Sequence, residues 1–331
     1  MGSFQSSLTP LIPIVRYRFR LEALDDLHFP AYPGSTWRGL LGHGLRRAVC
    51  VTHQPRCDGC LLAGTCIYST LFESPAPSEA ARRRFTSIPH PFILALDGPG
   101  PRRVLSRQFV SVGVNLVGEA NNAVPYLIHA LNLAGQRGIG TAQGRFRVAS
   151  VHQEPKLGED VWEQVYDIGS ATYRRLPTAL FQLSPPPDRI ALILMTPLRI
   201  KRDGRFVVPR TFRPGDLLYH LGLRLAMLQA FYGGDGSPDI PRRIELEEPE
   251  GLLLEHNLHW HEWTRYSSRQ QTEMQMGGLI GDMVLDGAVA RPYWSRLWMG
   301  QWCHLGKGTS MGLGRYRLTD VASLPPARRT A

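Results

Sequence analysis

The sequence predicts an α+β protein of two tandem ferredoxin-like (RRM-like) domains, each with the element order β-α-β-β-α-β. The first observation is a duplicated loop. The segments GIGTAQGRFRVASV (138–151) and GKGTSMGLGRYRL (306–318) share G-x-G-T-x-x-G and then Arg-aromatic-Arg. The second is a Pro-Gly turn leading into a helical pattern, at 33–48 and again at 214–227, upstream of each loop. Matched segments in the same order indicate that the two halves fold alike.

In the first half, strand-like and helix-like patterns follow the ferredoxin-like order. The run RYRFRL alternates basic and aromatic residues, which is typical of a strand with two different faces. The expected strands lie near 11–24, 91–97, 104–117 and 144–152, and the expected helices near 35–50 and 121–136. A cysteine-rich insertion at about 50–72 follows the first helix, and this domain is assigned to residues 1–183.

The second half repeats the pattern after a proline-rich linker. Three successive prolines in LSPPPDR (183–189) disfavour both helix and sheet pairing. The run IKRDGRFVVP is typical of a hairpin that turns at Asp203 and Gly204. The expected strands lie near 189–200, 252–266 and 313–319, and the expected helices near 215–232 and 293–302. This domain is assigned to residues 184–331 and carries the second glycine-rich loop.

Composition narrows the class of partner. Of the 331 residues 43% are apolar, which is enough for a core, and 38 Lys and Arg against 28 Asp and Glu give a net charge of +10. This excess favours a polyanion, because basic side chains that neutralise phosphates release counterions, although solubility alone would also account for it. Lysine is scarce, and the planar fork of arginine favours nucleic acid.

The sequence also indicates a compartment. No apolar run is long enough to cross a bilayer, and the N-terminus lacks the pattern of a signal peptide. Five cysteines, an odd number, agree with reducing surroundings. We therefore expect a cytoplasmic protein with no membrane association.

The glycine-rich loops have two interpretations. Glycine permits positive φ and close approach of a ligand, so exposed N–H groups would bind phosphate oxygens, with charge added by Lys307 and Arg315. The same glycines would also suit a tight helix-to-strand connection without a ligand. Neither loop is a P-loop, which would require G-x-x-x-x-G-K-[ST], and neither is a Rossmann fingerprint, because both loops precede strands.

The segment HLGKGTSMGLGRYRL (304–318) resembles the glycine-rich loop of the CRISPR pre-crRNA processing endoribonucleases of the RAMP superfamily. The segments WTRYSSRQQTEMQMGGLIGDMVLDG (263–287) and FPAYPGSTWRGLLGHGLRRAVC (29–50) resemble the same family. The resemblance covers both halves and leaves out roughly residues 155–190. It implies two ferredoxin-like domains side by side, in agreement with the duplication.

The resemblance also implies metal-independent cleavage of CRISPR repeat RNA, with no cofactor for catalysis. The ribose 2′-OH attacks the adjacent phosphate and leaves a 2′,3′-cyclic phosphate and a 5′-OH, which requires a base, an acid and positive charge. His43 is the expected base because it lies in the first-helix motif where many members carry a catalytic histidine, although a packing histidine would also fit. Arg46 and Arg47 follow at helical spacing as cations, and Tyr32 is expected to orient the 2′-OH.

Basic residues are expected to bind the RNA. On the strand RYRFRL, one face carries Arg16, Arg18 and Arg20 as a phosphate track, with a solvated edge as the other interpretation. The remaining residues expected to contact RNA are Arg38, Arg265, Arg269, Gly306, Lys307, Gly308, Gly312, Gly314 and Arg315. The expected partners are CRISPR repeat RNA or crRNA and other CRISPR effector subunits.

Four cysteines follow the first helix with the spacing C-x6-C-x2-C-x5-C: Cys50, Cys57, Cys60 and Cys66. The central C-x2-C in an Asp-Gly turn is typical of a knuckle that points two thiolates at one ion. A structural zinc is the favoured interpretation, and an iron–sulfur cluster and metal-free thiols stay open. Such a zinc would not cut RNA, because its four ligand positions would all be filled.

Two other functions compete with the endoribonuclease. A non-catalytic RAMP-type RNA-binding subunit of a CRISPR effector complex would share the fold and charge and differ at His43 and its neighbours. A zinc-containing nucleotide-binding enzyme is disfavoured, because the sequence has neither a carboxylate cluster for Mg²⁺ nor a P-loop.

Overall fold

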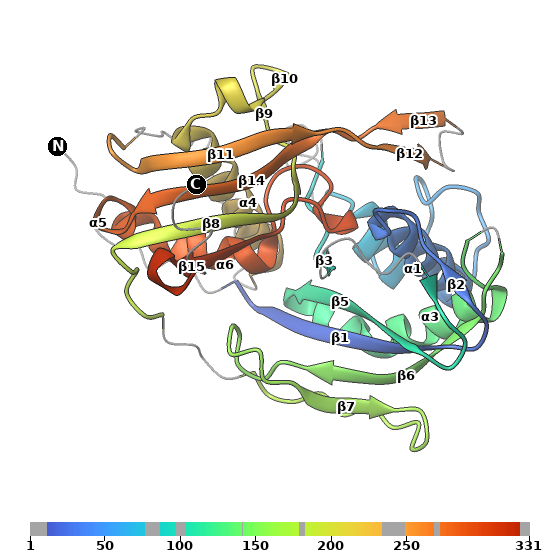
Figure 1. The fold of residues 1–331 in the computed structure, drawn as a ribbon. Helices are drawn as coiled ribbons and strands as arrows, with labels where there is room; N and C mark the ends of the chain where they lie inside the picture. The colour runs from blue at the N-terminus through green and yellow to red at the C-terminus, as the bar shows by residue number, and fades with distance from the viewer. Residues whose placement is uncertain are drawn as a thin grey trace. The chain divides into compact units, whose positions relative to one another are not determined.

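The computed structural model describes residues 12–76, 87–96, 103–140, 142–178, 183–233, 249–267 and 272–324 (Figure 1). The chain divides into two compact units. The N-terminal unit holds the described residues from 12 to 178 and those from 227 to 233, and the C-terminal unit holds those from 183 to 226 and from 249 to 324.

The N-terminal unit is built on a five-stranded antiparallel sheet of order β3-β5-β1-β6-β7. The strands are β1 (Ile14–Ala23), β3 (Phe92–Ala95), β5 (Phe109–Val117), β6 (Phe146–Gln153) and β7 (Glu163–Asp167), and the helices are α1 (Gly34–Val49) and α3 (Val124–Arg137). The first strand of the motif lies between the third and the fourth, which is the ferredoxin-like arrangement. Strand β7 is an addition at the edge beside β6.

Short elements join these strands. Strands β2 (Leu27–His28) and β4 (Arg103–Val104) pair with each other, so the strand expected at 104–117 is two strands, β4 and β5. The break has a local cause, because Arg107 has a φ of 68° and cannot continue an extended strand. Helical turns of other kinds lie at Ser69–Glu73, Gly118–Ala123, Pro209–Thr211, Arg291–Tyr293, Thr309–Met311 and Val321–Ser323.

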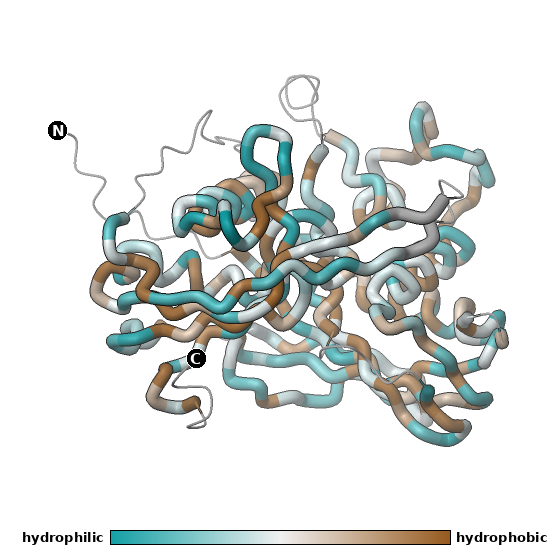
Figure 2. Tube along the Cα trace, turned by 45° about the horizontal axis from the view of Figure 1, so that its top comes forward, coloured by the Kyte–Doolittle hydropathy of each residue, from teal (hydrophilic) through white to brown (hydrophobic). Residues whose placement is uncertain are grey.

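Strand β1 has one apolar face and one basic face, as its alternating sequence predicts. Tyr17, Phe19 and Leu21 are fully buried and belong to one core cluster with Trp37 of α1 and Leu127 of α3. Figure 2 shows such alternation as successive hydrophilic and hydrophobic segments along the strands. The two helices therefore cover one face of the sheet, and the arginines of β1 lie on the other.

The C-terminal unit repeats the same topology in a four-stranded antiparallel sheet of order β11-β14-β8-β15. Its strands are β8 (Arg189–Leu198), β11 (Leu253–His261), β14 (Gly278–Asp286) and β15 (Tyr316–Asp320). Its helices are α5 (Gly287–Ala290), α6 (Trp294–Cys303) and the part of α4 (Pro214–Tyr232) that precedes residue 227. The first strand again lies between the third and the fourth. The predicted fold class of two tandem ferredoxin-like domains is thereby confirmed.

Two hairpins extend the C-terminal unit. Strands β9 (Lys201–Arg202) and β10 (Arg205–Phe206) pair around Asp203 and Gly204, as predicted, with φ values of 50° and 78°. Strands β12 (Thr264–Ser267) and β13 (Thr272–Gln275) form the other hairpin. The strand expected at 252–266 is thus β11 followed by β12, whereas β14 was not expected.

The duplicated loops have similar positive φ values at their first glycine pair. Gly138 and Gly306 have φ values of 85° and 80°, and Gly140 and Gly308 have values of 72° and 82°. Positive φ favours glycine, which explains why both copies keep it. Within the described part of the chain, no helix has the length and apolar character that a membrane span requires.

Helix α1 crosses α3 at backbone distance, and this contact can be tested. A Cβ atom at Gly44 would lie 2.2 Å from the carbonyl oxygen of Ala130. We expect Gly44→Ala to lower the free energy of unfolding by about 1–3 kcal/mol through overpacking. A Cβ atom at Gly39 of the same helix would meet no atom within 4 Å. Gly39→Ala should therefore raise the free energy of unfolding by up to about 1 kcal/mol, because alanine favours the helix more than glycine does. Equal changes in urea midpoint for the two variants would contradict the close helix contact.

Candidate nucleic-acid interface

Helix α1 presents a histidine and an arginine to solvent. Apolar residues recur every three or four positions, so Trp37, Leu41 and Leu45 are buried in the core. His43 and Arg47 are exposed and four residues apart, which places them on one face as predicted. The basic last turn also complements the partial negative charge at the helix C-terminus.

Tyr32 does not join His43. Its side chain is half-buried two residues before helix α1 begins, and the helix then runs nine residues to His43, about 14 Å along its axis. No described residue hydrogen-bonds to the His43 imidazole. The structure therefore does not bring the predicted catalytic pair into direct contact.

Arg46 is turned toward the cysteine-rich segment. Its guanidinium donates a hydrogen bond to the carbonyl oxygen of Gln54 and lies 5.7 Å from the centre of the Tyr68 ring. Arg46 was expected to act beside His43, but in the structure its own side chain contacts the cysteine-rich segment instead. Arg47 is left as the cation on the exposed face.

Arg38 contacts the half-buried side chain of His90 in the N-terminal unit. Its Nη2 lies 3.4 Å from Nε2 of His90, and its guanidinium is 5.4 Å from the centre of the Phe72 ring. The other ring nitrogen of His90, Nδ1, lies 2.9 Å from the hydroxyl of Ser74. These contacts fix the direction of the half-buried Arg38 side chain.

Arg18 and Arg20 form an arginine face on the side of β1 opposite the core. Arg18 lies 4.1 Å from the centre of the Trp162 ring, and its Nη2 is 3.6 Å from the exposed carboxylate of Asp160. Arg20 is exposed and lies 3.8 Å from the centre of the Phe109 ring. Aromatic rings therefore hold both guanidinium groups while leaving hydrogen-bond donors for another partner.

Arg16 has a different role from its two neighbours on that face. Its Nη1 lies 2.7 Å from Oε2 of Glu154, and the two side chains are only 9% and 0% exposed. The charge of Arg16 is thus already balanced inside the protein, which does not favour its predicted role in a phosphate track.

His152 on β6 completes the arginine face and was missed by sequence reasoning. It pairs in register with Arg18 on the neighbouring strand. Burial lowers its pKa, and the positive charges of Arg18 and then Arg20 lower it further. The ferredoxin-like order offered a signal for it, since that order puts the last strand beside the first.

The second glycine-rich loop is packed against strand β8. The N–H of Lys307 donates to the carbonyl of Arg199 at 2.8 Å, and the N–H of Gly314 donates to that of Pro197 at 3.0 Å. A Cβ atom at Gly306 would lie 2.4 Å from the Arg199 carbonyl oxygen, so glycine is needed for this approach. These donors are consequently not available to a phosphate.

The interior of the loop is also hydrogen-bonded to itself. The N–H of Met311 donates to the carbonyl of Gly308 at 2.8 Å, and that of Gly312 donates to the carbonyl of Thr309 at 2.9 Å. The expected cradle of bare N–H groups is therefore not formed by these residues. The exposed side chain of Lys307 and the half-buried one of Arg315 supply the loop's positive charge.

Two further predicted RNA-binding residues follow Trp263 in the sequence. Arg265 is part of strand β12 and pairs in register with Met274. Arg269 lies outside the described residues.

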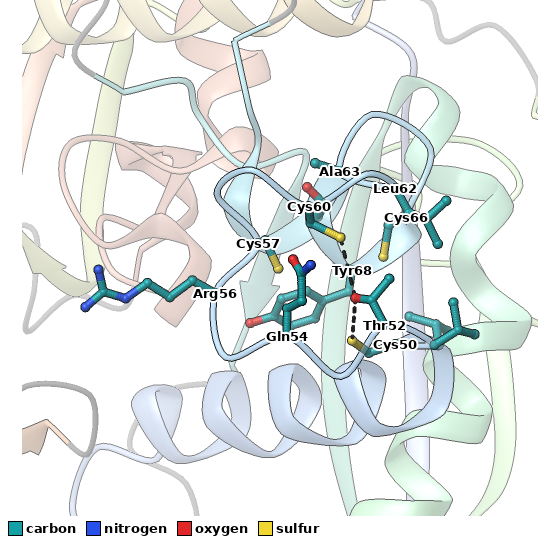
Figure 3. Close-up of a pocket in the computed structure, with 13 residues that line it drawn as sticks. Cys50, Thr52, Gln54, Arg56, Cys57, Cys60, Leu62, Ala63, Cys66 and Tyr68 are labelled. Atoms are coloured by element: carbon teal, nitrogen blue, oxygen red, sulfur yellow. Dashed lines mark hydrogen bonds between the residues drawn. The ribbon is translucent and has the colours of Figure 1, made fainter.

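The four predicted zinc ligands line one pocket (Figure 3). Cys50, Cys57, Cys60 and Cys66 are half-buried free thiols, and Thr52 lies among them. The Thr52 hydroxyl is 4.0 Å from Sγ of Cys50 and 3.5 Å from Sγ of Cys60. Among the described residues, no three His, Cys, Asp or Glu side chains are close enough to hold a metal ion. The thiols are thus neighbours without the geometry of a filled site.

The thiols differ in their electrostatics. Burial raises the pKa of Cys57, and the charge of Glu73 adds to this effect. Burial also acts to raise the pKa of Cys50, but the N–H of His53 and other polar neighbours outweigh it and lower the pKa. Cys303 is fully buried in the C-terminal unit, where burial raises the pKa of its thiol to about 11.

The class of protein that the structure defines is a duplicated ferredoxin-like fold with arginines on the open face of its N-terminal sheet. Residues 192–316 match the model of the CRISPR-associated endoribonuclease Cas6, and residues 11–178, about half of the chain, match AF_1859_N, the model of an N-terminal domain. The chain therefore belongs to the family defined by the AF_1859_N type of N-terminal domain, and its C-terminal unit matches the Cas6 endoribonuclease model.

The relatives of this chain are distant in sequence. An uncharacterized protein of Archaeoglobus fulgidus is 22% identical over 317 residues, which cover 93% of this chain and 98% of the relative. A partial Cas6-RT-Cas1–Cas2 complex superimposes with a TM-score of 0.51 at 12% identity over 94% of this chain and 47% of that one, which shows the shared fold. Thermus thermophilus Cas6 covers 93% of this chain and 99% of its own, with 15% identity and a TM-score of 0.47.

The electrostatics of the arginine face lead to a prediction. We expect Arg20→Gln to raise the pKa of His152, because an imidazolium would then meet one positive charge less. Titration of the ring Cε1–H signal by NMR measures this pKa, and Arg47→Gln on helix α1 is the control. In the unfolded chain His152 has the higher, ordinary pKa of 6.5, so its protonation favours unfolding. The contribution of His152 to the free energy of unfolding therefore decreases as the pH falls below 6.5. An unchanged pKa in Arg20→Gln would contradict the described geometry.

Proposed function

We propose that this protein is a metal-independent endoribonuclease that binds CRISPR repeat RNA and cleaves the precursor transcript. The observation that carries the proposal is the match of residues 192–316 to the Cas6 endoribonuclease model. The excess of arginine and the arginine face of the N-terminal unit support an RNA partner. The protein would act in the cytoplasm, where CRISPR transcripts are made.

The reaction is an internal transesterification. A base removes the proton of the ribose 2′-OH, the 2′-oxygen bonds to the adjacent phosphorus, and the bond from phosphorus to the 5′-oxygen breaks. The leaving oxygen takes up a proton, so the products are a 2′,3′-cyclic phosphate and a 5′-OH. The nucleophile is part of the substrate, so neither a metal-bound water nor a cofactor is required.

His43 is proposed as the general base on helix α1. It is exposed and can reach a bound strand, and histidine changes charge near neutral pH. Arg47, on the same exposed face, would stabilise the negative charge that develops on the phosphorane. The close contact of Gly44 with α3 holds this helix in place, which a positioned base requires.

Arg18 and Arg20 are proposed to bind the RNA backbone, with Arg38, Lys307 and Arg315 as further cations. The aromatic rings beside the two face arginines pre-order them, so less side-chain entropy is lost when a phosphate binds. Solved relatives include a Cas6 product complex and a Cas6 substrate mimic complex, and another is a Cas6-RT-Cas1–Cas2 complex. By analogy, repeat RNA and other CRISPR proteins are the proposed partners.

A second candidate is a non-catalytic RNA-binding subunit of a CRISPR effector complex. One observation favours it: no described residue orients the His43 imidazole through a hydrogen bond, and Tyr32 lies at the other end of the helix. A general base usually needs such an orienting group. Cleavage itself distinguishes the two candidates.

The first test is cleavage of a repeat RNA in EDTA. Wild-type protein should cut it and leave a 5′-OH, and a 2′-deoxy at the scissile position should block the reaction. His43→Ala should lower the single-turnover rate by about 100-fold or more, as expected for loss of a general base, while RNA affinity is retained. His129→Ala, an exposed histidine on helix α3, is the matched control.

Two results would change the proposal. If His43→Ala cuts as fast as wild type, the nuclease stands and the catalytic role moves to other residues, first Arg47 and Lys307. If the wild type binds the repeat tightly and never cuts it, the endoribonuclease is rejected and the RNA-binding subunit takes its place.

A second test concerns the arginine face. Replacing Arg18 and Arg20 together by Ala should weaken RNA binding and reduce the slope of log affinity against log salt by about 1 to 2, since each phosphate contact contributes just under one. The matched control is Arg147→Ala on the same sheet, because Arg147 is neutralised by Glu22 at 2.8 Å. An unchanged slope in the double variant would remove this face from the RNA path.

A further inference from the structure

The segment from Cys50 to Cys66 is compact although it has no apolar interior. None of its residues is buried, and its apolar side chains point outward, with Leu61 91% and Val51 71% exposed. The half-buried residues are Thr52, Ala63 and the four cysteines: Cys50, Cys57, Cys60 and Cys66. The inside of the segment thus consists largely of thiols.

Its backbone turns back at the central cysteine pair. The N–H of Cys60 donates to the carbonyl of Cys57 at 3.1 Å, and Gly59 between them has a φ of 72°. The next turns are also local, with Ala63 bonded to Cys60 at 3.0 Å and Cys66 to Leu62 at 2.8 Å. This tight C-x2-C turn is the form of a knuckle that aims two thiolates at one point.

We propose that Cys50, Cys57, Cys60 and Cys66 bind one structural Zn²⁺ ion that holds this segment against the end of helix α1. Four thiolates are a soft tetrahedral donor set, which zinc prefers, and a closed set leaves no position for a reacting water. A small segment without an apolar core commonly depends on such a cross-link.

Zinc binding requires the four sulfurs to draw closer together, since among the described residues no three ligating side chains are yet within reach of one ion. The four cysteines line one pocket, and Figure 3 shows the Thr52 hydroxyl between the sulfur atoms of Cys50 and Cys60. The distances from this hydroxyl, 4.0 Å to Cys50 Sγ and 3.5 Å to Cys60 Sγ, place these two sulfurs no more than 7.5 Å apart. In a zinc site with bonds of about 2.3 Å, sulfurs are about 3.8 Å apart. The segment can make this shift because it has no buried side chain to displace.

A counter-charge is already in place. Four thiolates and one Zn²⁺ carry two net negative charges, which need a nearby cation. Arg46 lies close enough to act electrostatically on Cys50 and Cys57, and its guanidinium is bonded to the carbonyl of Gln54 within the same segment. This accounts for the turn of Arg46 away from the face of His43.

The site is joined to the helix that carries His43. Cys50 caps helix α1, and its N–H donates to the carbonyl of Arg46 at 2.9 Å. A metal bound to Cys50 therefore anchors the last turn of α1, in which Arg47 lies. The zinc would stabilise the helix without taking part in the reaction.

The test is the metal content of the full-length chain, expressed with added zinc and dialysed against EDTA. We expect about one zinc per chain, and we expect Cys60→Ser and Cys66→Ser to lose it. Cys303→Ala, which removes a thiol of the C-terminal unit, is the control and should keep the zinc. Cobalt added to the metal-free protein should give the visible bands of tetrahedral Co²⁺ with thiolate charge transfer.

Four outcomes would overturn the proposal. They are less than about a tenth of a zinc per chain without cobalt bands, zinc retained in the cysteine variants, iron with acid-labile sulfide, and mass spectra that show the four thiols paired as disulfides. Variants that fail to fold leave the wild-type zinc content and the cobalt spectrum as the deciding measurements. None of these measurements depends on RNA cleavage, so they stand apart from the proposed function.

Discussion

The two-faced alternation of strand β1 is the constraint on which the N-terminal unit depends. Tyr17 and Phe19 fill the core under the helices, while Arg18 and Arg20 lie on the opposite face. A slip of one residue in the pairing with β5 or β6 would exchange these faces and bury cations in the core. The core therefore fixes the register, and the register fixes where positive charge meets solvent.

Much of the fold was predictable because the same pattern occurs twice. The Pro-Gly turns, the helical patterns and the loops around Gly138 and Gly306 mark corresponding points in each half. Strand β14 was missed because its sequence, GLIGDMVLD, contains Gly281 with a φ of 116° at an irregularity in the pairing, and glycine weakens a strand pattern. The duplication nevertheless indicated that the second half should have a fourth strand, as the first half does.

The candidate site was less predictable, because charge in a sequence does not reveal its partner. Spacing alone placed Arg16 with Arg18, but only the structure shows Glu154 beside it. In the same way, helical spacing placed Arg46 near His43, whereas its side chain contacts the cysteine-rich segment. His152 became visible only once the pairing of β6 with β1 was known. Contacts made outside a residue's own strand or helix therefore decide these roles.

The pairing of Arg16 with Glu154 has a consequence for how the chain can evolve. Both side chains are buried and their charged atoms are 2.7 Å apart, so losing one partner alone costs about 3–5 kcal/mol. Replacing both by apolar residues that fit can be neutral. A substitution of Arg16 or Glu154 alone is therefore penalised, whereas a substitution of both can be tolerated. We expect these two positions to change together in evolution.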